Sequence, residues 1–295
     1  MFDYLCFSKK TDMKARLILI LLIAAALSAC NDDPVDIKII TFNIRYDNPS
    51  DGINAWPYRR NMVVEFLERQ EAGLFGLQEA LWNQYIYIDS SLVDWGSVAV
   101  GRNDGQREGE MTPIFYRKDL FDLEESGTFW LSETPGVPGS RGWGAVLPRI
   151  VTWASLTRKD DGSSLYYFNT HFSHMSDSAR IMSSKVLRRE VIRIAGENDF
   201  IITGDFNMLP DSRAYSELVQ APFLDSYLAP GITPGGVAFT FNGFNDNTGD
   251  GRIDYVFVRE GLEVLSHTTM TIKNDPVFIS DHWPVIVTVR LGSLK

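Results

Sequence analysis

The chain has few cysteines and few basic side chains for its length, and it lacks the repeated long apolar runs of a multi-span membrane protein. Two cysteines among 295 residues cannot form a disulfide framework. Because 38 acidic residues outnumber 28 lysines and arginines, the net charge is −10, which argues against a protein that mainly coats nucleic acid. A hydrophobic content of 44%, with 18 Phe, 11 Tyr and 7 Trp, excludes disorder and supplies a sizeable core.

The first thirty residues have the parts of a secretory signal, and both cysteines lie within them. The basic segment Lys14-Ala15-Arg16 precedes an apolar stretch over residues 17–26, which is short for a bilayer-spanning helix of ~20 residues. The ending Leu27-Ser28-Ala29-Cys30 resembles the lipobox of bacterial lipoproteins, in which the cysteine is acylated. We therefore predict a signal peptide over residues 1–29 and lipidation at Cys30. The alternative interpretation is a short buried helix.

This interpretation has consequences for the start, the charge and the location of the protein. Met13 stands at the natural start of such a signal, which leaves residues 1–12 open to being an upstream mis-start. Removal of residues 1–29 takes away two more basic than acidic residues, so the net charge falls from −10 to −12. We predict a lipidated tether over residues 30–36 and a location in the cell envelope, anchored to a bacterial membrane. The acidic start Asn31-Asp32-Asp33 favours the outer membrane or the cell surface.

Residues 37–292 are predicted to form one folded domain of the α/β class. Short apolar runs rich in Val, Ile, Phe and Tyr, each bounded by turn residues, predict strands over 37–44, 74–77, 97–101, 113–116, 150–156, 165–172, 200–203, 253–258 and 285–291. Apolar stripes at helical spacing predict helices over 59–71 and 178–195. Strands mixed with helices on this scale indicate a layered sandwich.

Polar side chains occur where these predicted strands meet loops. The segments concerned are Thr41-Phe42-Asn43, Gly76-Leu77-Gln78-Glu79, Asn169-Thr170-His171-Phe172, Thr203-Gly204-Asp205-Phe206-Asn207, Arg252-Ile253-Asp254-Tyr255 and Ser280-Asp281-His282-Trp283-Pro284. In layered α/β folds such positions can converge on one crevice. Several oxygen ligands without a cysteine suit a hard cation such as Mg²⁺ or Mn²⁺.

Taken together, these segments resemble the endonuclease/exonuclease/phosphatase superfamily of deoxyribonuclease-like phosphoesterases. The resemblance rests on Gln78-Glu79, Gly204-Asp205-Phe206-Asn207, Arg252-Ile253-Asp254-Tyr255 and Ser280-Asp281-His282 in this order. It implies a four-layered α/β sandwich, with two packed mixed β-sheets flanked by helices, and a catalytic domain over residues 37–292. It also implies metal-dependent hydrolysis of a phosphate ester.

The resemblance assigns five residues to a cation and to an attacking water. Glu79 is expected to be the principal ligand of Mg²⁺ or Mn²⁺, with Asp281 at the same cation or nearby. Asn43 would orient Glu79 and the phosphate. Asp205 and Asn207 match the pair that positions water, with Asp205 as the general base.

The same resemblance implies a second group of residues around the phosphoryl group. His282, oriented by Asp254, would bind the phosphoryl group that is transferred. His171 matches a second family histidine, and Glu110 would be its partner. Arg149 would contact phosphate. Chemistry alone favours such types, because phosphoryl transfer needs a base, a positioned donor and a cation to offset developing charge.

The predicted function is hydrolysis of a small phosphodiester or phosphomonoester by activated water. The sequence contains no Gly-x-Ser-x-Gly elbow that would suggest a covalent route. We expect a monomer, with a small phosphate ester as substrate. The acidic balance disfavours nucleic acid. Two alternatives stay open: a secreted metal-dependent nuclease, and a non-catalytic binding lipoprotein that would stack its ligand on Trp56, Trp82, Trp95, Trp130 or Trp143.

Lipidation can be tested by substitution at the predicted acylation site. Cys30→Ala should abolish incorporation of a fatty-acid analogue, because the acylated thiol is then missing. The label is read on the protein expressed in a bacterium that processes lipoproteins, with Cys6→Ala as the control. Labelling of Cys30→Ala at the level of the wild type would contradict the prediction.

Overall fold

The computed structural model describes residues 35–246 and 251–291. The predicted signal peptide, Cys30 and the tether up to residue 34 lie outside the described residues, as does residue 292. The first strand begins at Val35, two residues before the predicted start of the domain. Among the described residues, no helix combines the length and the apolar character that crossing a bilayer requires.

One large sheet has seven strands, in the order β10-β12-β15-β1-β2-β4-β3. Its central strands β1 and β2 are parallel, whereas β15 runs antiparallel to β1. The bounds of its strands are β1 (Val35–Asn43), β2 (Leu74–Gln78), β3 (Trp95–Val98), β4 (Ile114–Arg117), β10 (Gly235–Gly236), β12 (Glu263–Thr269) and β15 (Val285–Leu291).

The second large sheet has six strands, in the order β5-β6-β7-β8-β11-β9, with β7 and β8 parallel. Their bounds are β5 (Phe121–Trp130), β6 (Ile150–Arg158), β7 (Ser164–His171), β8 (Asp199–Asp205), β9 (Phe223–Asp225) and β11 (Asp254–Arg259). A short hairpin is formed by β13 (Lys273–Asn274) and β14 (Val277–Phe278).

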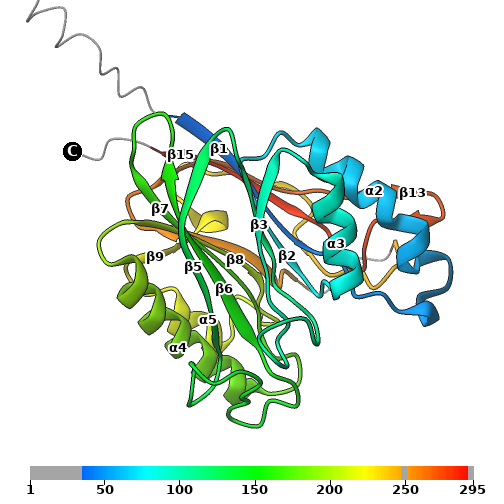
Figure 1. The fold of residues 1–295 in the computed structure, drawn as a ribbon, viewed down its shortest axis with the longest axis horizontal. Helices are drawn as coiled ribbons and strands as arrows, with labels where there is room; N and C mark the ends of the chain where they lie inside the picture. Colours follow the sequence, from blue (N-terminus) through cyan, green and yellow to red (C-terminus); the bar gives the residue numbers. More distant parts are fainter. Residues whose placement is uncertain (1–34, 247–250, 292–295) are drawn as a thin grey trace, which may run out of the picture.

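Helices cover the outer face of each sheet, so that the molecule has four layers (Figure 1). Helices α2 (Trp56–Arg69) and α3 (Trp82–Ser91) pack on the seven-stranded sheet, and α4 (Asp177–Ala195) and α5 (Arg213–Leu218) pack on the six-stranded sheet. Two short 3₁₀ helices, η1 (Pro49–Asn54) and η2 (Ser226–Leu228), complete the elements. The predicted class, a four-layered α/β sandwich of two mixed sheets flanked by helices, is confirmed.

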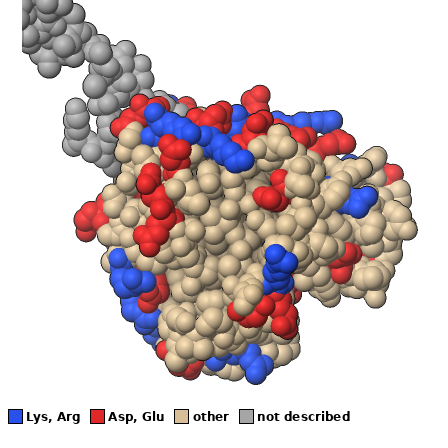
Figure 2. Space-filling view, viewed as in Figure 1, with Lys and Arg blue, Asp and Glu red and all other residues tan. Residues whose placement is uncertain are grey.

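Charged side chains of both signs mix on the surface. On the face seen in Figure 2, basic side chains lie beside acidic ones along the rim, and much of the middle of the face carries neither. Exposed ion pairs such as Lys159 with Asp122 and Arg290 with Asp36 contribute to this mixing. No broad basic stripe is visible on this face.

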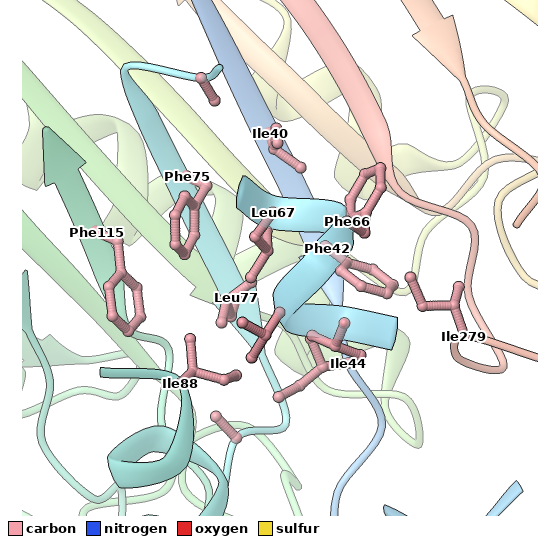
Figure 3. Packing of buried hydrophobic residues seen from close by; sticks show 14 of the residues in the cluster. Ile40, Phe42, Ile44, Phe66, Leu67, Phe75, Leu77, Ile88, Phe115 and Ile279 are labelled. Carbon is pink, nitrogen blue, oxygen red and sulfur yellow. The ribbon is translucent and has the colours of Figure 1, made fainter. Parts of the chain in front are cut away.

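Alternation along the strands separates three hydrophobic layers. In β1, Ile37 and Ile39 face the other sheet, whereas Ile40 and Phe42 face α2 and α3, because successive side chains of a strand point to opposite faces. Figure 3 shows the second group, with Phe66 of α2 packed over Phe42. Since both faces of the central strands are buried, they read as nearly continuous apolar runs in the sequence.

Several element boundaries differ from the sequence-based prediction. The strand predicted over 97–101 lies at β3, Trp95–Val98, because the chain then leaves the sheet for a loop in which the backbone N–H of Gly101 donates to Gln106. The predicted first helix begins three residues earlier, at Trp56, with Pro57 in its first turn. Three of the longer elements are absent from the prediction: α3 is rich in Tyr and Ile, β5 is an edge strand with a charged exposed segment, and β12 is half exposed. The short elements α5, β9, β10, β13, β14, η1 and η2 are absent from it as well.

A buried polar network joins the two sheets directly beneath the strand ends. The side-chain amide of Asn169 in β7 donates to the backbone oxygens of Leu77 and Pro113, at 2.7 and 2.9 Å. Its oxygen accepts from Gln78 of β2 at 2.7 Å and from Thr203 of β8 at 3.1 Å. These bonds fix the register of one sheet on the other where the polar strand ends meet.

Gly76→Ala should destabilise the protein by about 1–3 kcal/mol or more, as overpacking of a tight interface does. A Cβ at Gly76 would stand 2.3 Å from Thr203 Oγ1 and 2.6 Å from Asn169 Oδ1, so this network would have to shift. Urea denaturation measures the loss. The matched control is Gly136→Ala, an exposed site where a Cβ meets nothing within 4 Å. Equal stability of the two variants would show that the contact is relaxed easily.

Candidate active site

The polar strand ends converge on one cleft of about 550 Å³. The parallel pairs β1–β2 and β7–β8 end at the same edge of the sandwich, and the antiparallel strand β11 begins there, opposite the end of β8. This register places His171, Asp205 and Asp254 side by side across three strands. The cleft is lined by Arg45, Tyr46, Glu79, Glu110, Leu147, Arg149, His171, His174, Asp205, Asn207, Phe241, Ile253, Asp281 and His282.

The side chain of Asn43 connects the acidic residues of the two sheets. It is fully buried, and its Nδ2 donates to Asp205 Oδ2 at 2.9 Å and to Glu79 Oε1 at 3.2 Å. The same nitrogen lies 3.5 Å from His282 Nε2. Because the backbone N–H of Arg45 donates to Asn43 Oδ1 at 2.9 Å, the amide is held with its donor towards the carboxylates.

Glu79 and Asp281 present carboxylates beside a fixed guanidinium. Glu79 Oε2 accepts from the backbone N–H of Tyr46 at 3.1 Å. Arg45 Nη1 lies 3.7 Å from Asp281 Oδ2, and the rest of its guanidinium is bound by Asp51 at 3.0 and 3.1 Å. Burial, together with the charge of Glu79, raises the pKa of Asp281 against the opposing effect of His282. Negative charge is thus concentrated at this end of the cleft.

His282, Asp254 and Asp205 form a buried cluster of titratable side chains. His282 Nδ1 lies 2.9 Å from Asp254 Oδ2, and its Nε2 lies 3.8 Å from Asp205 Oδ2. Burial alone would lower the pKa of His282, but Asp254 and Asp205 outweigh it and raise that pKa well above 6.5. Burial and the charge of Asp254 raise the pKa of Asp205 to about 7. The imidazole is therefore charged at neutral pH, and the Asp205 carboxyl titrates in the range that suits a general base.

His171 has a different environment from His282. Its Nε2 lies 3.0 Å from Asn207 Nδ2 and 3.4 Å from Asp205 Oδ2. Its Nδ1 is 3.7 Å from Glu110 Oε2, beyond hydrogen-bond distance. Burial, reinforced by Arg149 and Arg102, lowers the pKa of His171 well below 6.5, so this imidazole is neutral.

The remaining wall of the cleft carries Arg149, Glu110 and His174, and Arg102 pairs with Glu110. Arg102 and His174 are not among the residues that the sequence predicts. Glu110 Oε2 accepts from Arg102 Nη1 at 2.6 Å and lies 3.9 Å from Arg149 Nη1. The Nη2 of Arg149 donates to His174 Nδ1 at 3.0 Å. Burial lowers the pKa of Arg149 to about 10, which still leaves it charged at neutral pH.

Three residues other than glycine have left-handed backbone at the cleft. Their φ angles are 56° at Arg45, 61° at Glu79 and 48° at Asn207. Such conformations cost on the order of 1–3 kcal/mol each and persist where the surrounding structure enforces them. Here they turn the chain sharply at three strand ends, so that each side chain enters the cleft.

The donor set fits a hard divalent cation. Ligand atoms of Glu79, His171 and Asp205 lie within 4.8 Å of one another, and so do those of Asp205, Asp254 and His282. In the second group Asp254 Oδ2 already accepts from His282, so the end of the cleft that carries Glu79 is the better place for an ion. Burial and the charges of Asp254 and Glu79 raise the pKa of Asp205, and burial and Glu79 raise that of Asp281. A cation would offset this concentration of negative charge.

Comparison with known proteins agrees with this geometry. The sequence model of the Endonuclease/Exonuclease/phosphatase family matches residues 40–282, which include the strand ends from Asn43 to His282. The chain belongs to this family. Members generally depend on a divalent cation, and hydrolysis of a phosphate ester is the reaction class that membership supports. No curated protein matches the sequence at a significant level.

Three solved structures illustrate the similarity. A family protein from Bacteroides vulgatus is 36% identical, with a TM-score of 0.83 over 87% of this chain and 99% of that one. A family protein from Bacteroides thetaiotaomicron is 32% identical, with a TM-score of 0.82 over 88% and 100%. A mannosyl-6-phosphatase from the same organism is 32% identical, with a TM-score of 0.80 over 86% and 99%.

The structure brings all ten predicted site residues of the family domain into one place. Of these, eight line the cleft directly, while Asn43 and Asp254 lie buried behind it and hold the groups that do. Arg45, Arg102 and His174 were missed. Spacing could have found two of them, since Arg45 follows Asn43 by two residues and His174 follows His171 by three, each on the loop leaving a strand.

A second depression lies beside η1 and the start of α2. It measures about 720 Å³ and is lined by apolar residues of the segment 49–58 and by Pro276 and Val277. Asp47 is the one ionisable acid or base among its lining residues apart from the Tyr58 phenol. Although larger, it lacks the groups that phosphate-ester hydrolysis needs, so the polar cleft is the candidate active site.

In the metal-free protein, Asp205→Asn should change how the unfolding free energy depends on pH. The pKa of this carboxyl is 3.8 when unfolded and about 7 when folded, so between these values only the folded protein retains the proton. The contribution of this carboxyl to the stability of the wild type therefore falls as pH rises through this window. As pH rises from ~4 to ~7, the free energy of unfolding of the variant should increase relative to that of the wild type by up to roughly 4 kcal/mol. Above pH ~7 this difference should stay constant.

Urea denaturation with EDTA at several pH values measures this difference. Asp211→Asn, an exposed acid on the loop after β8, controls for the loss of a charge. A difference between Asp205→Asn and wild type that stays constant with pH would contradict the raised pKa of Asp205.

Proposed function

We propose that the protein hydrolyses a small phosphate ester, by attack of an activated water, with Mg²⁺ or Mn²⁺ as cofactor. The observation that carries this proposal is the Asn43 amide, which holds Glu79 of one sheet and Asp205 of the other within reach of the charged His282. A cation site, a base and a phosphoryl-binding donor thus lie around one point.

Glu79 and Asp281 would hold the cation, which when bound supplies positive charge to offset the charge that develops on the phosphoryl oxygens. Arg45 faces the same carboxylate of Asp281 and limits the negative charge there. The strained backbone of Glu79 and its bond from the Tyr46 N–H set the carboxylate in place before a ligand arrives.

Asp205 is the proposed general base for the attacking water. Its Oδ1 accepts from the backbone N–H of Asn207 at 3.0 Å, and its Oδ2 accepts from Asn43, so the carboxylate cannot rotate. The Asn207 side chain lies next to His171 and helps to orient water at this end. With a pKa near 7, Asp205 can take a proton from water at neutral pH and release it again.

His282 is the proposed donor to a non-bridging phosphoryl oxygen. Asp254 holds its Nδ1, so Nε2 points towards the cleft with its proton. Because the imidazole is positively charged, its hydrogen bond strengthens as negative charge grows on the phosphoryl group. Arg149, which lines the same cleft, is proposed to contact the same phosphoryl group.

The substrate is proposed to be small. The net charge of −10 offers little attraction for a long polyanion, since affinity for DNA rests mainly on Lys and Arg contacts to phosphates. The face drawn in Figure 2 carries charges of both signs and no broad basic stripe. A cleft of about 550 Å³ has the size of sites for single small ligands. The similarity to a mannosyl-6-phosphatase at 32% identity points in the same direction.

The alternative of a non-catalytic binding protein has less support. Its stacking surface would need accessible tryptophans, but Trp56, Trp95 and Trp130 lie in the cores with 3%, 8% and 4% exposure. Trp82 and Trp143 are half-buried, and neither lines the cleft. The nuclease alternative is tested below by comparing cleavage of plasmid DNA with turnover of small esters.

For location, we propose attachment to the bacterial envelope through an acylated Cys30, as a monomer. The preceding segment would join the domain at Val35, the start of β1, whereas the cleft lies at the other end of this nine-residue strand. The strand spans about 26 Å. The cleft would therefore face away from the membrane, towards soluble substrates rather than lipid head groups of the anchoring bilayer.

Activity is tested with p-nitrophenyl phosphate and bis-p-nitrophenyl phosphate. The wild type should release p-nitrophenol with Mg²⁺ or Mn²⁺, and EDTA should stop the reaction. Asp205→Asn and His282→Ala should each lower the rate by about 10² or more, because each removes a group that acts in the transition state. Asp211→Asn, a surface acid of the same loop, should retain the wild-type rate.

Failure of the wild type with both esters and with either metal would refute the proposed function and favour ligand binding. Efficient nicking of a plasmid, with slower turnover of both small esters, would favour the nuclease.

A further inference from the structure

His174 lines the cleft but has no role in the chemistry assigned above. It lies on the loop after β7, three residues beyond His171, and it is exposed, whereas His171 and His282 are buried. Leu147 and Arg149 come from the segment before β6 and line the same cleft, and Arg149 contacts His174. These three residues are therefore available to contact the substrate.

The hydrogen bond to Arg149 fixes the protonation pattern of His174. A guanidinium only donates, so the Nδ1 at 3.0 Å must be the acceptor, and the ring proton sits on Nε2. Although His174 is exposed, partial desolvation at the cleft and the charge of Arg149 lower its pKa, which favours the neutral ring. Within residues 35–246 and 251–291, Nε2 makes no hydrogen bond, so this N–H is available to a ligand.

The position of His174 is held by its own loop. Arg180 of α4 donates to the backbone oxygen of Ser173 at 2.7 Å. The hydroxyl of Ser176 donates to the backbone oxygen of Trp143 at 3.0 Å, which ties this loop to the segment that carries Arg149. His174 and Arg149 therefore form one prearranged unit rather than two independent surface groups.

The positive charge of Arg149 is not cancelled by the nearest acid. Glu110 makes its close ion pair with Arg102 at 2.6 Å, whereas Arg149 Nη1 stays 3.9 Å away and has no hydrogen-bond partner. The guanidinium is only 5% exposed, so its charge acts where little water screens it. An anion in the cleft is the natural counter-charge.

The number of donors then separates two substrate classes. A phosphodiester has two non-bridging oxygens and one negative charge, and the cation with His282 can serve both. A phosphomonoester has a third such oxygen and close to a second charge at neutral pH. We propose that Arg149 and the Nε2–H of His174 bind this third oxygen, so that the enzyme is a phosphomonoesterase. This inference rests on the proposed function.

Two substitutions at position 174 separate direct contact from support of Arg149. His174→Asn keeps an acceptor near the place of Nδ1 for Arg149 but lacks the distal donor. His174→Gln can place an amide N–H near the position of Nε2. Met175→Ala, at the exposed neighbouring residue, is the matched control.

We expect the wild type to prefer p-nitrophenyl phosphate to bis-p-nitrophenyl phosphate. His174→Asn should lower kcat/KM for the monoester roughly 10- to 100-fold, the range for a hydrogen bond to a charged group, and lower that for the diester less than about threefold. His174→Gln should stay within about threefold of the wild type for both. In His174→Asn, inhibition by inorganic phosphate, which also has this third oxygen, should weaken along with the fall in kcat/KM for the monoester.

The outcomes distinguish the two proposals. Equal losses on both esters in His174→Asn, a larger loss on the diester, or a wild type that cleaves only the diester would overturn the inference while leaving phosphate-ester hydrolysis intact. Absence of turnover of either ester by the wild type would instead remove the proposed function on which it rests.

Discussion

The arrangement of the cleft depends on one constraint, the repulsion among carboxylates that are placed together away from water. Glu79, Asp205, Asp254 and Asp281 lie around a single point, and burial makes their mutual repulsion costly. The Asn43 amide, the charged His282 and the Arg45 guanidinium supply the hydrogen bonds and positive charge that permit it. The negative charge that these groups do not offset is available to bind a cation, which would in turn bind a phosphoryl group.

The hydrophobic layers below the cleft make this concentration of charge mechanically possible. Three separate cores hold the two sheets and their helices together, and the Asn169 network locks one sheet against the other close to the strand ends. Close packing gives the strand ends little freedom to move apart, so the carboxylates cannot relieve their repulsion by separating. The rigid apolar layers therefore hold the polar residues of the cleft in place before a ligand binds.

Much of this organisation could be predicted from sequence, and the exceptions have physical reasons. Long buried strands such as β1 and β8 have apolar runs that end in Asn43 and Asp205, so both the strand and its polar end are visible. The edge strand β5 is charged on its exposed segment, and α3 is rich in Tyr and Ile. The local sequence pattern therefore predicts neither the strand nor the helix. Contacts such as Arg149 with His174 depend on how two loops meet, which neither loop reveals alone.

The distance along the chain between partners has a thermodynamic consequence. Asn43 and His282, which meet in the cleft, are 239 residues apart, and no short fragment contains both. A ligand that touches residues from both sheets can therefore bind only to the completely assembled domain. By mass action, each such ligand shifts the folding equilibrium of the whole chain rather than of one lobe. Occupancy of the cleft and resistance to proteolysis of the domain are then two measures of the same equilibrium.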